Sequence, residues 1–310
     1  MAGNNTNLIN AKKAKNDEFY TLYEDVEAEL MNYKEYFKDK VIYLPCDTAD
    51  SAFWQFFMNH HLDLGLKKLI ATHYDENGKA YKIWIEEDTT GDGYIDDGDA
   101  LQEDLIGNGD FRSPECIEIL KESDIVCTNP PFSLFREFMD WIISHDKQFL
   151  IIGSQNAFTY KEIFPLFKEG KIWTGYNKVK QFIQPDGTTK KFGNICWFTN
   201  LPVNKDDEIP LTKTYNPKDY PKYDNYNAIE VGRVANIPKN YYDVMGVPIT
   251  FIDKYNPNQF VILGHTSSCD ISSEVEELRI DSNFRNRGRI NGKEKYDRIL
   301  IKRNEAKANE

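Results

Sequence analysis

The sequence predicts an α/β protein with a doubly wound, mostly parallel sheet, followed by a smaller α+β region at the carboxyl end. From Val41 to about Lys168, short apolar runs typical of buried strands alternate with helical apolar patterns, which indicates a sheet covered by helices. After Asn200 the alternation stops, and prolines and tyrosines recur instead. The 310 residues suit one large domain or two modest ones.

The elements follow in chain order. A helix carrying Val26, Leu30, Tyr33 and Phe37 precedes the sheet, and residues 1–15 ahead of it are expected to form a loose polar arm. The expected strands are 41–44, 67–74, 81–85, 125–128, 148–153, 172–173 and 195–198. The expected helices are 52–58, 114–122, one with Phe135, Phe138, Met139 and Ile142 on one side, and 160–168. A hairpin-like polar loop with Asp186 and Gly187 joins the last two strands.

Composition and cysteine usage indicate a folded protein of a reducing compartment. Hydrophobic residues make up 40% of the chain and aromatic residues 14%. The five cysteines form no close pair and leave an odd one over, which argues against a disulfide framework or a zinc site and predicts a cytoplasmic protein. No signal peptide is expected, and no apolar run is long enough to span a bilayer.

The net charge of −12 is concentrated in one part of the chain. Residues 86–110 hold ten acidic residues and no lysine or arginine, whereas residues 279–310 hold ten basic residues and five acidic ones. Net charge governs solubility and steering, so it does not exclude a local basic surface for nucleic acid.

The stretch Asn129-Pro130-Pro131-Phe132 is the most informative part of the sequence. It directly follows the apolar run 125–128, and two prolines without N–H groups must end that strand. The result is a stiff loop at the carboxyl end of a strand, where open α/β sheets bind ligands. The Asn129 oxygen and the Pro130 carbonyl can each accept one hydrogen of an exocyclic amine, while Phe132 stacks on a planar base. A proline-rich loop that merely terminates a strand is the alternative.

Asn-Pro-Pro-Phe after a hydrophobic strand resembles the catalytic loop of amino-methyltransferases that use S-adenosylmethionine, especially the DNA adenine-N6 enzymes. Residues 220–226, 244–251, 290–293 and 298–302 resemble the carboxyl-terminal part of EcoRI-type adenine-specific DNA methyltransferases. The resemblance thus spans nearly the whole chain. It implies a sheet of the class I methyltransferase type, S-adenosylmethionine as cofactor, and a catalytic group of Asn129, Pro130, Pro131 and Phe132.

Two further segments resemble cofactor-binding motifs of this family. Phe19, Tyr20 and Thr21 match the motif that lines the methionine end of the cofactor; a capped helix start with core aromatics is the alternative. Asp110 and Phe111 match the motif whose carboxylate accepts from the cofactor's adenine amine and whose ring packs on that adenine. A turn that caps the helix 114–122 is the alternative here.

The turn after the first strand departs from the family pattern, because the glycines expected there are absent. Asp47 and Asp50 remain as partners for the methionine ammonium, although Asp50 or Ser51 could instead cap the next helix. An acid after the second strand, Asp75 or Glu76, could hold the ribose, and the sequence does not decide between them.

The acidic stretch from Asp88 to Asp99 matches much of a calcium-loop pattern, with Gly93 at the sharp turn. It departs from that pattern in having Asp99 where a bidentate Glu is usual, and in following a strand rather than a helix. An acidic surface hairpin or insertion is therefore the favoured interpretation, and no metal is assigned to the site.

The region after the sheet is expected to recognise DNA. We divide the chain into the arm 1–15, a catalytic and cofactor-binding domain 16–200 and a target-recognition region 201–310. Arg285, Arg287 and Arg289, spaced by Asn and Gly, suggest a flexible arm for phosphates or a groove. A solvated basic loop is the alternative.

The predicted function is transfer of a methyl group from S-adenosylmethionine to the N6 amine of an adenine that is flipped out of double-stranded DNA. The resemblance further implies a restriction–modification system, in which a cognate endonuclease acts on the same site without a stable complex. Protein-glutamine methylation, cytosine-N4 methylation and a non-catalytic DNA-binding protein on this fold are the alternatives.

Overall fold

The computed structural model describes residues 20–76, 79–184, 186–204, 208–266, 273–280 and 287–304. The chain forms two compact units. Unit 1 combines the chain up to Ser154 with Ile172–Val203, and unit 2 combines Gln155–Lys171 with the chain from Asn204 onward. The division expected from the sequence, at residue 200, differs from this in placing Gln155–Lys171 with the sheet.

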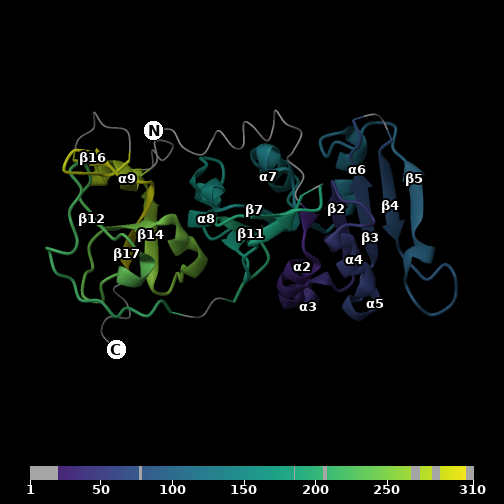
Figure 1. Ribbon diagram of the computed structural model, residues 1–310, viewed down its shortest axis with the longest axis horizontal. Helices are drawn as coiled ribbons and strands as arrows, with labels where there is room; N and C mark the ends of the chain where they lie inside the picture. The colour runs from purple at the N-terminus through teal and green to yellow at the C-terminus, as the bar shows by residue number, and fades with distance from the viewer. Residues whose placement is uncertain are drawn as a thin grey trace. The chain divides into compact units, whose positions relative to one another are not determined.

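Unit 1 is built on an eight-stranded, mostly parallel sheet. Its strands, in spatial order, are β5 (Leu101–Asp104), β4 (Tyr81–Ile85), β3 (Lys68–His73), β2 (Val41–Pro45), β6 (Ile125–Thr128), β7 (Gln148–Ser154), β11 (Ile195–Thr199) and β8 (Trp173–Thr174). The four central strands β3, β2, β6 and β7 are parallel to one another, whereas β4 pairs antiparallel with β3 and β5, and β11 pairs antiparallel with β7 and β8 (Figure 1). The expected mixed α/β architecture with a large, mostly parallel sheet is confirmed.

Helices cover both faces of this sheet, because its central strands are apolar on both sides. Ile42 and Leu44 of β2 share one core cluster with Phe53 of α4 (Ala52–Asn59). The intervening Tyr43 points the other way, and its ring lies 6.3 Å from that of Trp141 in α7 (Phe135–Ser144). Figure 1 shows α2 (Tyr23–Leu30) on the same side as α4, with α6 (Pro114–Glu122) on the side of α7.

Several connecting elements refine the expected order. β4 and β5 form an antiparallel hairpin, so the segment before Asp110 is not the end of a parallel strand. The polar loop around Asp186 is itself a hairpin of β9 (Gln181–Ile183) and β10 (Thr189–Lys191), and β9 also pairs with β1 (Tyr20–Thr21). The remaining elements of unit 1 are η1 (Met31–Tyr33), α3 (Lys34–Phe37), α5 (His61–Leu64), η2 (Asp97–Asp99) and η3 (Phe132–Leu134).

Unit 2 has its own four-stranded sheet of order β12 (Ile229–Glu230), β13 (Met245–Pro248), β17 (Arg298–Arg303) and β14 (Phe260–His265). A separate two-stranded hairpin joins β15 (Arg289–Ile290) to β16 (Lys293–Glu294). The other elements are η4 (Gln155–Thr159), α8 (Phe164–Lys168), η5 (Val234–Asn236), η6 (Ile249–Lys254) and α9 (Ser273–Leu278). The helix expected at 160–168 is therefore shorter at its start and belongs to unit 2.

Within the described ranges, no helix has both the length and the apolar composition that crossing a bilayer requires.

Candidate active site

The loop that follows β6 lies at the carboxyl end of a central parallel strand. All four residues of β6 are buried, and Pro131 is extended with φ −54° and ψ 122°. The chain then turns into η3 and α7, which begins at Phe135. Asn129 is half-buried at the point where the strand ends. The predicted position of this loop in the sheet is thus observed.

The turn after β2 is joined to the same strand end by a hydroxyl. Thr128 Oγ1 lies 2.7 Å from Asp47 Oδ2 and 2.8 Å from the Pro45 carbonyl oxygen. Because β2 and β6 are parallel neighbours, their carboxyl ends meet at one edge of the sheet. Asp47 therefore stands beside the residue that directly precedes Asn129.

Asp47 is held by neutral groups. Burial raises the pKa of its carboxyl from 3.8 to about 7, and hydrogen bonds with Thr128 and Ser51 oppose this rise only in part. A buried carboxylate with no cation beside it gains most from a positively charged ligand. Asp47 is thus suited to hold an ammonium group.

Cys46 supplies the sharp bend for which the sequence offers no glycine. Its φ is +65°, in the left-handed region that favours glycine. The bend directly follows β2, so it turns the chain back toward β6 and delivers Asp47 to Thr128. The turn after β2 therefore has the conformation, although not the residue type, that a ligand-binding turn requires.

The ring of Phe132 belongs to an aromatic group that comes from the β9–β10 hairpin. Its centroid lies 6.0 Å from that of Phe182 and 6.4 Å from that of Phe192, and those two rings are 5.5 Å apart. Phe182 is the register partner of Thr21 in the small sheet. The structure thereby connects the predicted Tyr20–Thr21 motif to the Asn129 loop through one side chain.

Thr21 carries an orphaned polar atom. Its hydroxyl oxygen is buried and has no hydrogen-bond partner among the described residues. Such a group costs about 1–3 kcal/mol unless a ligand satisfies it. Tyr20 is half-exposed, and Phe19 lies outside the described residues. A hydroxyl such as that of Thr21 and a carboxyl such as that of Asp47 are groups that could pair with the charged ends of an amino acid, so their chemistry is compatible with the methionine part of S-adenosylmethionine.

Asp110 already has a cationic partner. The Arg112 guanidinium donates to both carboxylate oxygens, with Nε to Oδ1 at 2.9 Å and the terminal nitrogen to Oδ2 at 2.6 Å. The second terminal nitrogen reaches Glu137 Oε2 at 2.5 Å. The Arg112 side chain holds the pKa of Asp110 below its usual value. The carboxylate can accept an adenine amine only in competition with this ion pair.

Phe111 lies in the core, which corrects its expected contact with the cofactor. Its side chain is 2% exposed, and its ring packs against Phe138 at 5.0 Å and Trp141 at 5.2 Å in edge-to-face geometry. Both partners belong to α7. A ring enclosed in this way anchors α7 and offers no face to an adenine.

The remaining acids differ in exposure. Ser51, not Asp50, caps α4, since its Oγ accepts from Trp54 N at 3.1 Å, and Asp50 is exposed. After β3, Asp75 is half-buried and Glu76 is exposed.

The acidic loop connects β4 to β5, and its carboxylates are directed at its own backbone. Asp99 accepts from the N–H groups of Thr89, Thr90 and Asp96 at 2.8–3.0 Å. Asp88 accepts from two glycine N–H groups in the same way. These bonds lower the pKa of both carboxyls. Over the described part of the chain, no group of three or more His, Cys, Asp or Glu side chains is arranged to hold a metal ion.

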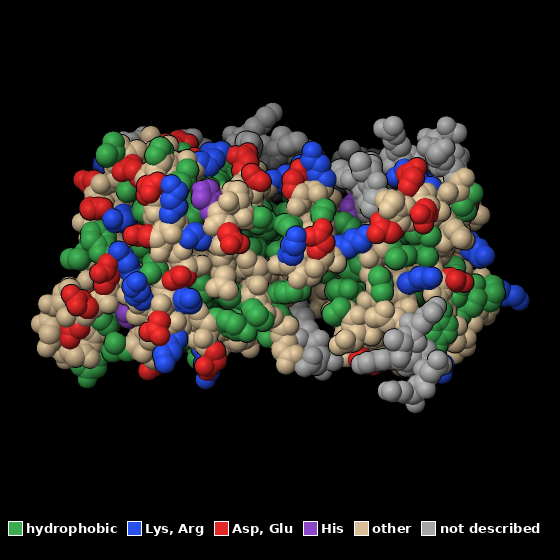
Figure 2. All heavy atoms as spheres, turned by 180° about the vertical axis from the view of Figure 1, so that it is seen from behind, with side chains coloured by type: hydrophobic (Ala, Val, Ile, Leu, Met, Phe, Trp, Pro, Cys, Tyr) green, Lys and Arg blue, Asp and Glu red, His purple; other side chains and the backbone are tan. Residues whose placement is uncertain are grey.

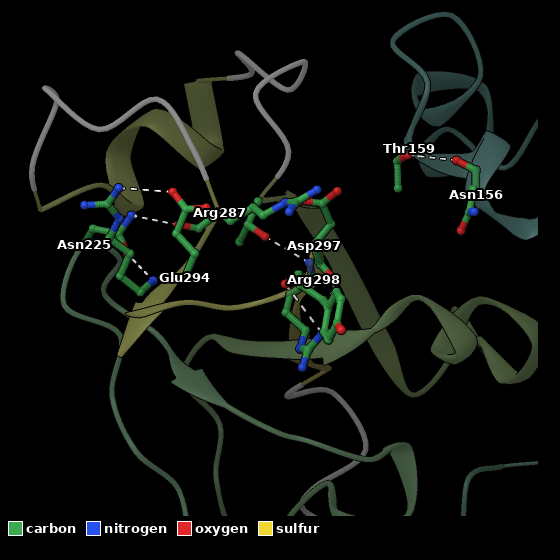
Figure 3. Close-up of polar contacts among 10 residues, drawn as sticks. Asn156, Thr159, Asn225, Arg287, Glu294, Asp297 and Arg298 are labelled. Carbon is green, nitrogen blue, oxygen red and sulfur yellow. Dashed lines mark hydrogen bonds and ion pairs between the residues drawn. The ribbon is translucent and has the colours of Figure 1, made fainter. Parts of the chain in front are cut away.

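The two described arginines of the predicted DNA arm are engaged with acids. Arg287 Nε lies 3.1 Å from Asp297, and a terminal nitrogen of Arg289 lies 3.1 Å from Glu294 (Figure 3). Asn225 fastens this segment, because its oxygen accepts from Arg289 N at 2.8 Å. The segment is therefore an anchored hairpin instead of the expected flexible arm. Arg285 lies outside the described residues.

Sequence reasoning missed Thr128, Cys46, Phe182 and Phe192. The hydroxyl at the last strand position before Asn129 was a usable signal for Thr128. The aromatic residues on both sides of the Asp186–Gly187 turn were a signal for Phe182 and Phe192. Nothing in the local sequence indicates a left-handed conformation at Cys46.

The chain is similar to known proteins over almost its whole length. Residues 7–304 match the model of the family described as adenine-specific methyltransferase EcoRI. The chain is 44% identical to the Type II methyltransferase M.EcoRI of Escherichia coli, over 97% of this chain and 98% of that protein. It is 38% identical to M.MpnI of Mycoplasma pneumoniae, over 94% of this chain and 96% of that protein. No solved structure gives a significant match.

Proposed function

This chain belongs to the family of EcoRI-type adenine-specific methyltransferases, and from that premise we propose how its residues act. It is a Type II DNA methyltransferase specific for adenine, and a role in restriction–modification is consistent with its relatives. This sets aside protein-glutamine methylation, cytosine-N4 methylation and a non-catalytic protein.

The position of Asn129 carries the proposal. It stands on a diproline loop at the carboxyl end of a central parallel strand, beside a turn that presents the half-buried Asp47 carboxyl. We assign to the Asn129 oxygen and the Pro130 carbonyl the two hydrogens of the adenine N6 amine. These bonds orient the nitrogen lone pair, which is the nucleophile. Positioning and local electrostatics then supply most of the catalysis.

S-adenosylmethionine, when bound, supplies an electrophilic methyl group on a sulfonium. Around it, Thr21 and Asp47 would hold the methionine end, with Tyr20 next to Thr21 in the chain, and Phe19 of the same motif lies outside the described residues. Asp110 would accept a hydrogen bond from the cofactor's adenine amine in competition with Arg112. Phe111 supports α7 from the core. The N6 nitrogen would take the methyl group as the bond from that methyl to the sulfonium sulfur breaks, the sulfur would leave as a neutral thioether, and the surplus proton on the nitrogen would pass to solvent.

The target adenine is extruded from the duplex, because its amine is out of reach inside the helix. Phe132 stacks on the extruded base, and the Phe182 and Phe192 rings keep Phe132 in place. Pro131 keeps the loop stiff, so that Pro130 and Phe132 stay in register.

The wider assignments are part of the same proposal. Unit 1 adopts the class I methyltransferase arrangement and binds the cofactor, and unit 2 recognises double-stranded DNA. A cognate endonuclease acts on the same site without a stable complex. None of the described cysteines is in a disulfide, which fits the reducing cytoplasm.

The test is Asn129→Ala, with Asn32→Ala as the matched control, since Asn32 is exposed and bonds only within its own helix. Loss of one acceptor should lower kcat roughly 100- to 1,000-fold. Cofactor affinity should stay within about threefold, because Asn129 contacts the amine. Labelled cofactor and plasmid DNA, followed by hydrolysis to nucleosides, measure N6-methyladenine directly. Near-normal methylation by the variant would refute the assignment.

A further inference from the structure

Two loops of unit 2 without regular secondary structure are fastened to each other. Lys239 N donates to the Lys213 carbonyl at 2.8 Å, and a β-bridge joins Lys213 to Pro238. Tyr215 N donates to Asn240 Oδ1 at 2.7 Å. Loops fastened in this way present their side chains from a fixed backbone, which lowers the entropy cost of binding a partner.

Tyrosine rings reinforce the junction. The Tyr215 ring lies 4.5 Å from that of Tyr241 and 5.6 Å from that of Tyr220. The Tyr220 hydroxyl donates to the Asn236 carbonyl at 2.8 Å. Burial, followed by Asp243, raises the pKa of Tyr241 to about 12, so its hydroxyl keeps its proton and can donate.

Main-chain contacts bring three cationic residues to this junction. Lys213 and Lys239 are exposed, and the Arg303 guanidinium at the end of β17 donates to the Lys239 carbonyl. Arg303 also lies 4.7 Å over the ring of Tyr242. We use the term tyrosine–lysine platform for the group of Lys213, Tyr215, Lys239, Tyr241, Tyr242 and Arg303.

The cations of the platform differ from those of the β15–β16 hairpin in their partners. Among the described residues, no carboxylate lies within 4.0 Å of the charged nitrogens of Lys213, Lys239 or Arg303. Arg287 and Arg289, in contrast, are both in ion pairs. A polyanion binds the first group without displacing an acid, whereas it must compete for the second.

We propose that the tyrosine–lysine platform contacts the sugar–phosphate backbone of the DNA substrate. This deepens the proposed function and rests on it. Lysine and arginine neutralise phosphates, and tyrosine hydroxyls donate to phosphate oxygens. The chain carries a net charge of −12, and Figure 2 shows acidic and basic side chains interspersed on the face seen from behind the view of Figure 1. A local group of cations without paired acids is therefore what an acidic protein needs to attract DNA.

The test is the double variant Lys213→Gln/Lys239→Gln, whose main-chain contacts stay in place. Each phosphate contact contributes about 0.9 to the slope of log K against log salt, so the slope should become shallower by about 2. The dissociation constant for a target duplex should rise roughly tenfold near physiological salt. The kcat at saturating DNA and the affinity for the cofactor should not change.

Three comparisons interpret the result. Lys213→Arg/Lys239→Arg should restore the slope, and Lys254→Gln, an exposed lysine of the same unit, should leave it unchanged. An unaltered slope in the glutamine double variant would overturn the proposal. A shallower slope in Arg287→Gln/Arg289→Gln alone would also overturn it, by moving the contact to the hairpin. These results concern DNA affinity, whereas the Asn129→Ala test concerns turnover, so the two assignments fail separately.

Discussion

Asp47 and Asp110 are two carboxyls proposed for the same cofactor, in opposite environments. Asp47 is surrounded by hydroxyls, and burial raises its pKa to about 7. Asp110 is bound at both oxygens by Arg112, which lowers its pKa. Among the described residues the first carboxyl has no ion-pair partner, and the second already has one.

The difference teaches which of the two can respond to a ligand. A cation that binds beside Asp47 stabilises the ionised carboxylate, which burial otherwise disfavours. The free energy of binding that cation therefore depends strongly on Asp47. A neutral amine that arrives at Asp110 must displace a guanidinium from a bidentate pair. We therefore expect variants at the β2 turn to have larger effects than variants at the turn before α6.

The largest effect is expected for Asp47→Asn, which keeps the size of the side chain and removes its charge. Loss of a charge-assisted bond to the cofactor ammonium should weaken cofactor binding about 10- to 100-fold, measured by calorimetry. Asp50→Asn, on the same turn but exposed, is the control and should bind normally. Equal losses of cofactor affinity in Asp47→Asn and Asp50→Asn would contradict the assignment of the ammonium contact to Asp47.

The pH dependence sharpens the same contrast. Asp47 ionises as pH rises through about 7, so cofactor affinity should fall up to tenfold per pH unit below that value. In Asp47→Asn this slope should be absent. The folded-state pKa lies above the unfolded value, so the contribution of Asp47 to the free energy of unfolding is full below pH 3.8 and declines as pH rises toward about 7. A wild-type affinity that is flat from pH 5 to 8 would contradict the assignment.

A smaller effect is expected at Thr128. Thr128→Val removes the hydroxyl that Asp47 and the Pro45 carbonyl share, and should lower kcat/KM about tenfold. Thr128→Ser keeps the hydroxyl and should stay within about threefold of wild type. If valine and serine behave alike, then the hydroxyl does not position the loop.

The smallest effect is expected for Arg112→Gln. The ion pair is partly exposed, with side chains 48% and 24% exposed, so its loss should change stability by at most about 1 kcal/mol. The released Asp110 should leave cofactor affinity within about threefold. A large loss of affinity would show that Arg112 itself contacts the cofactor, and the comparison of the two carboxyls would then fail.

The central sheet could be predicted from sequence because its strands are short apolar runs with clear ends. Pro130 ends β6, for instance, and Pro45 is the last residue of β2. β5 could not be predicted, because all four of its residues are exposed and it has no apolar pattern. The placement of Gln155–Lys171 in unit 2 depends on distant contacts, such as Gln155 Nε2 to Asp253 at 2.5 Å.

The site could be predicted only where a motif is contiguous. Asn129 and its prolines are adjacent in the chain, so their chemistry is readable from four residues. The bond between Thr128 and Asp47 joins residues 81 positions apart, and no local pattern indicates it. The pairing of Asp110 with Arg112 depends on side-chain rotamers, and the burial of Phe111 depends on how α7 packs.

The contact of Phe132 with Phe182 has a consequence for the order of binding. Phe182 of β9 is the register partner of Thr21, and its ring also contacts that of Phe132. A ligand bound at Thr21 and a base stacked on Phe132 would therefore both act on strand β9. If the methyl donor stiffens that strand, an extruded base finds its stacking partner already fixed. Thermodynamic reciprocity then requires each substrate to tighten the other by one common factor. Titration of DNA with and without a non-reactive cofactor analogue, and the reverse titration, would yield that factor twice.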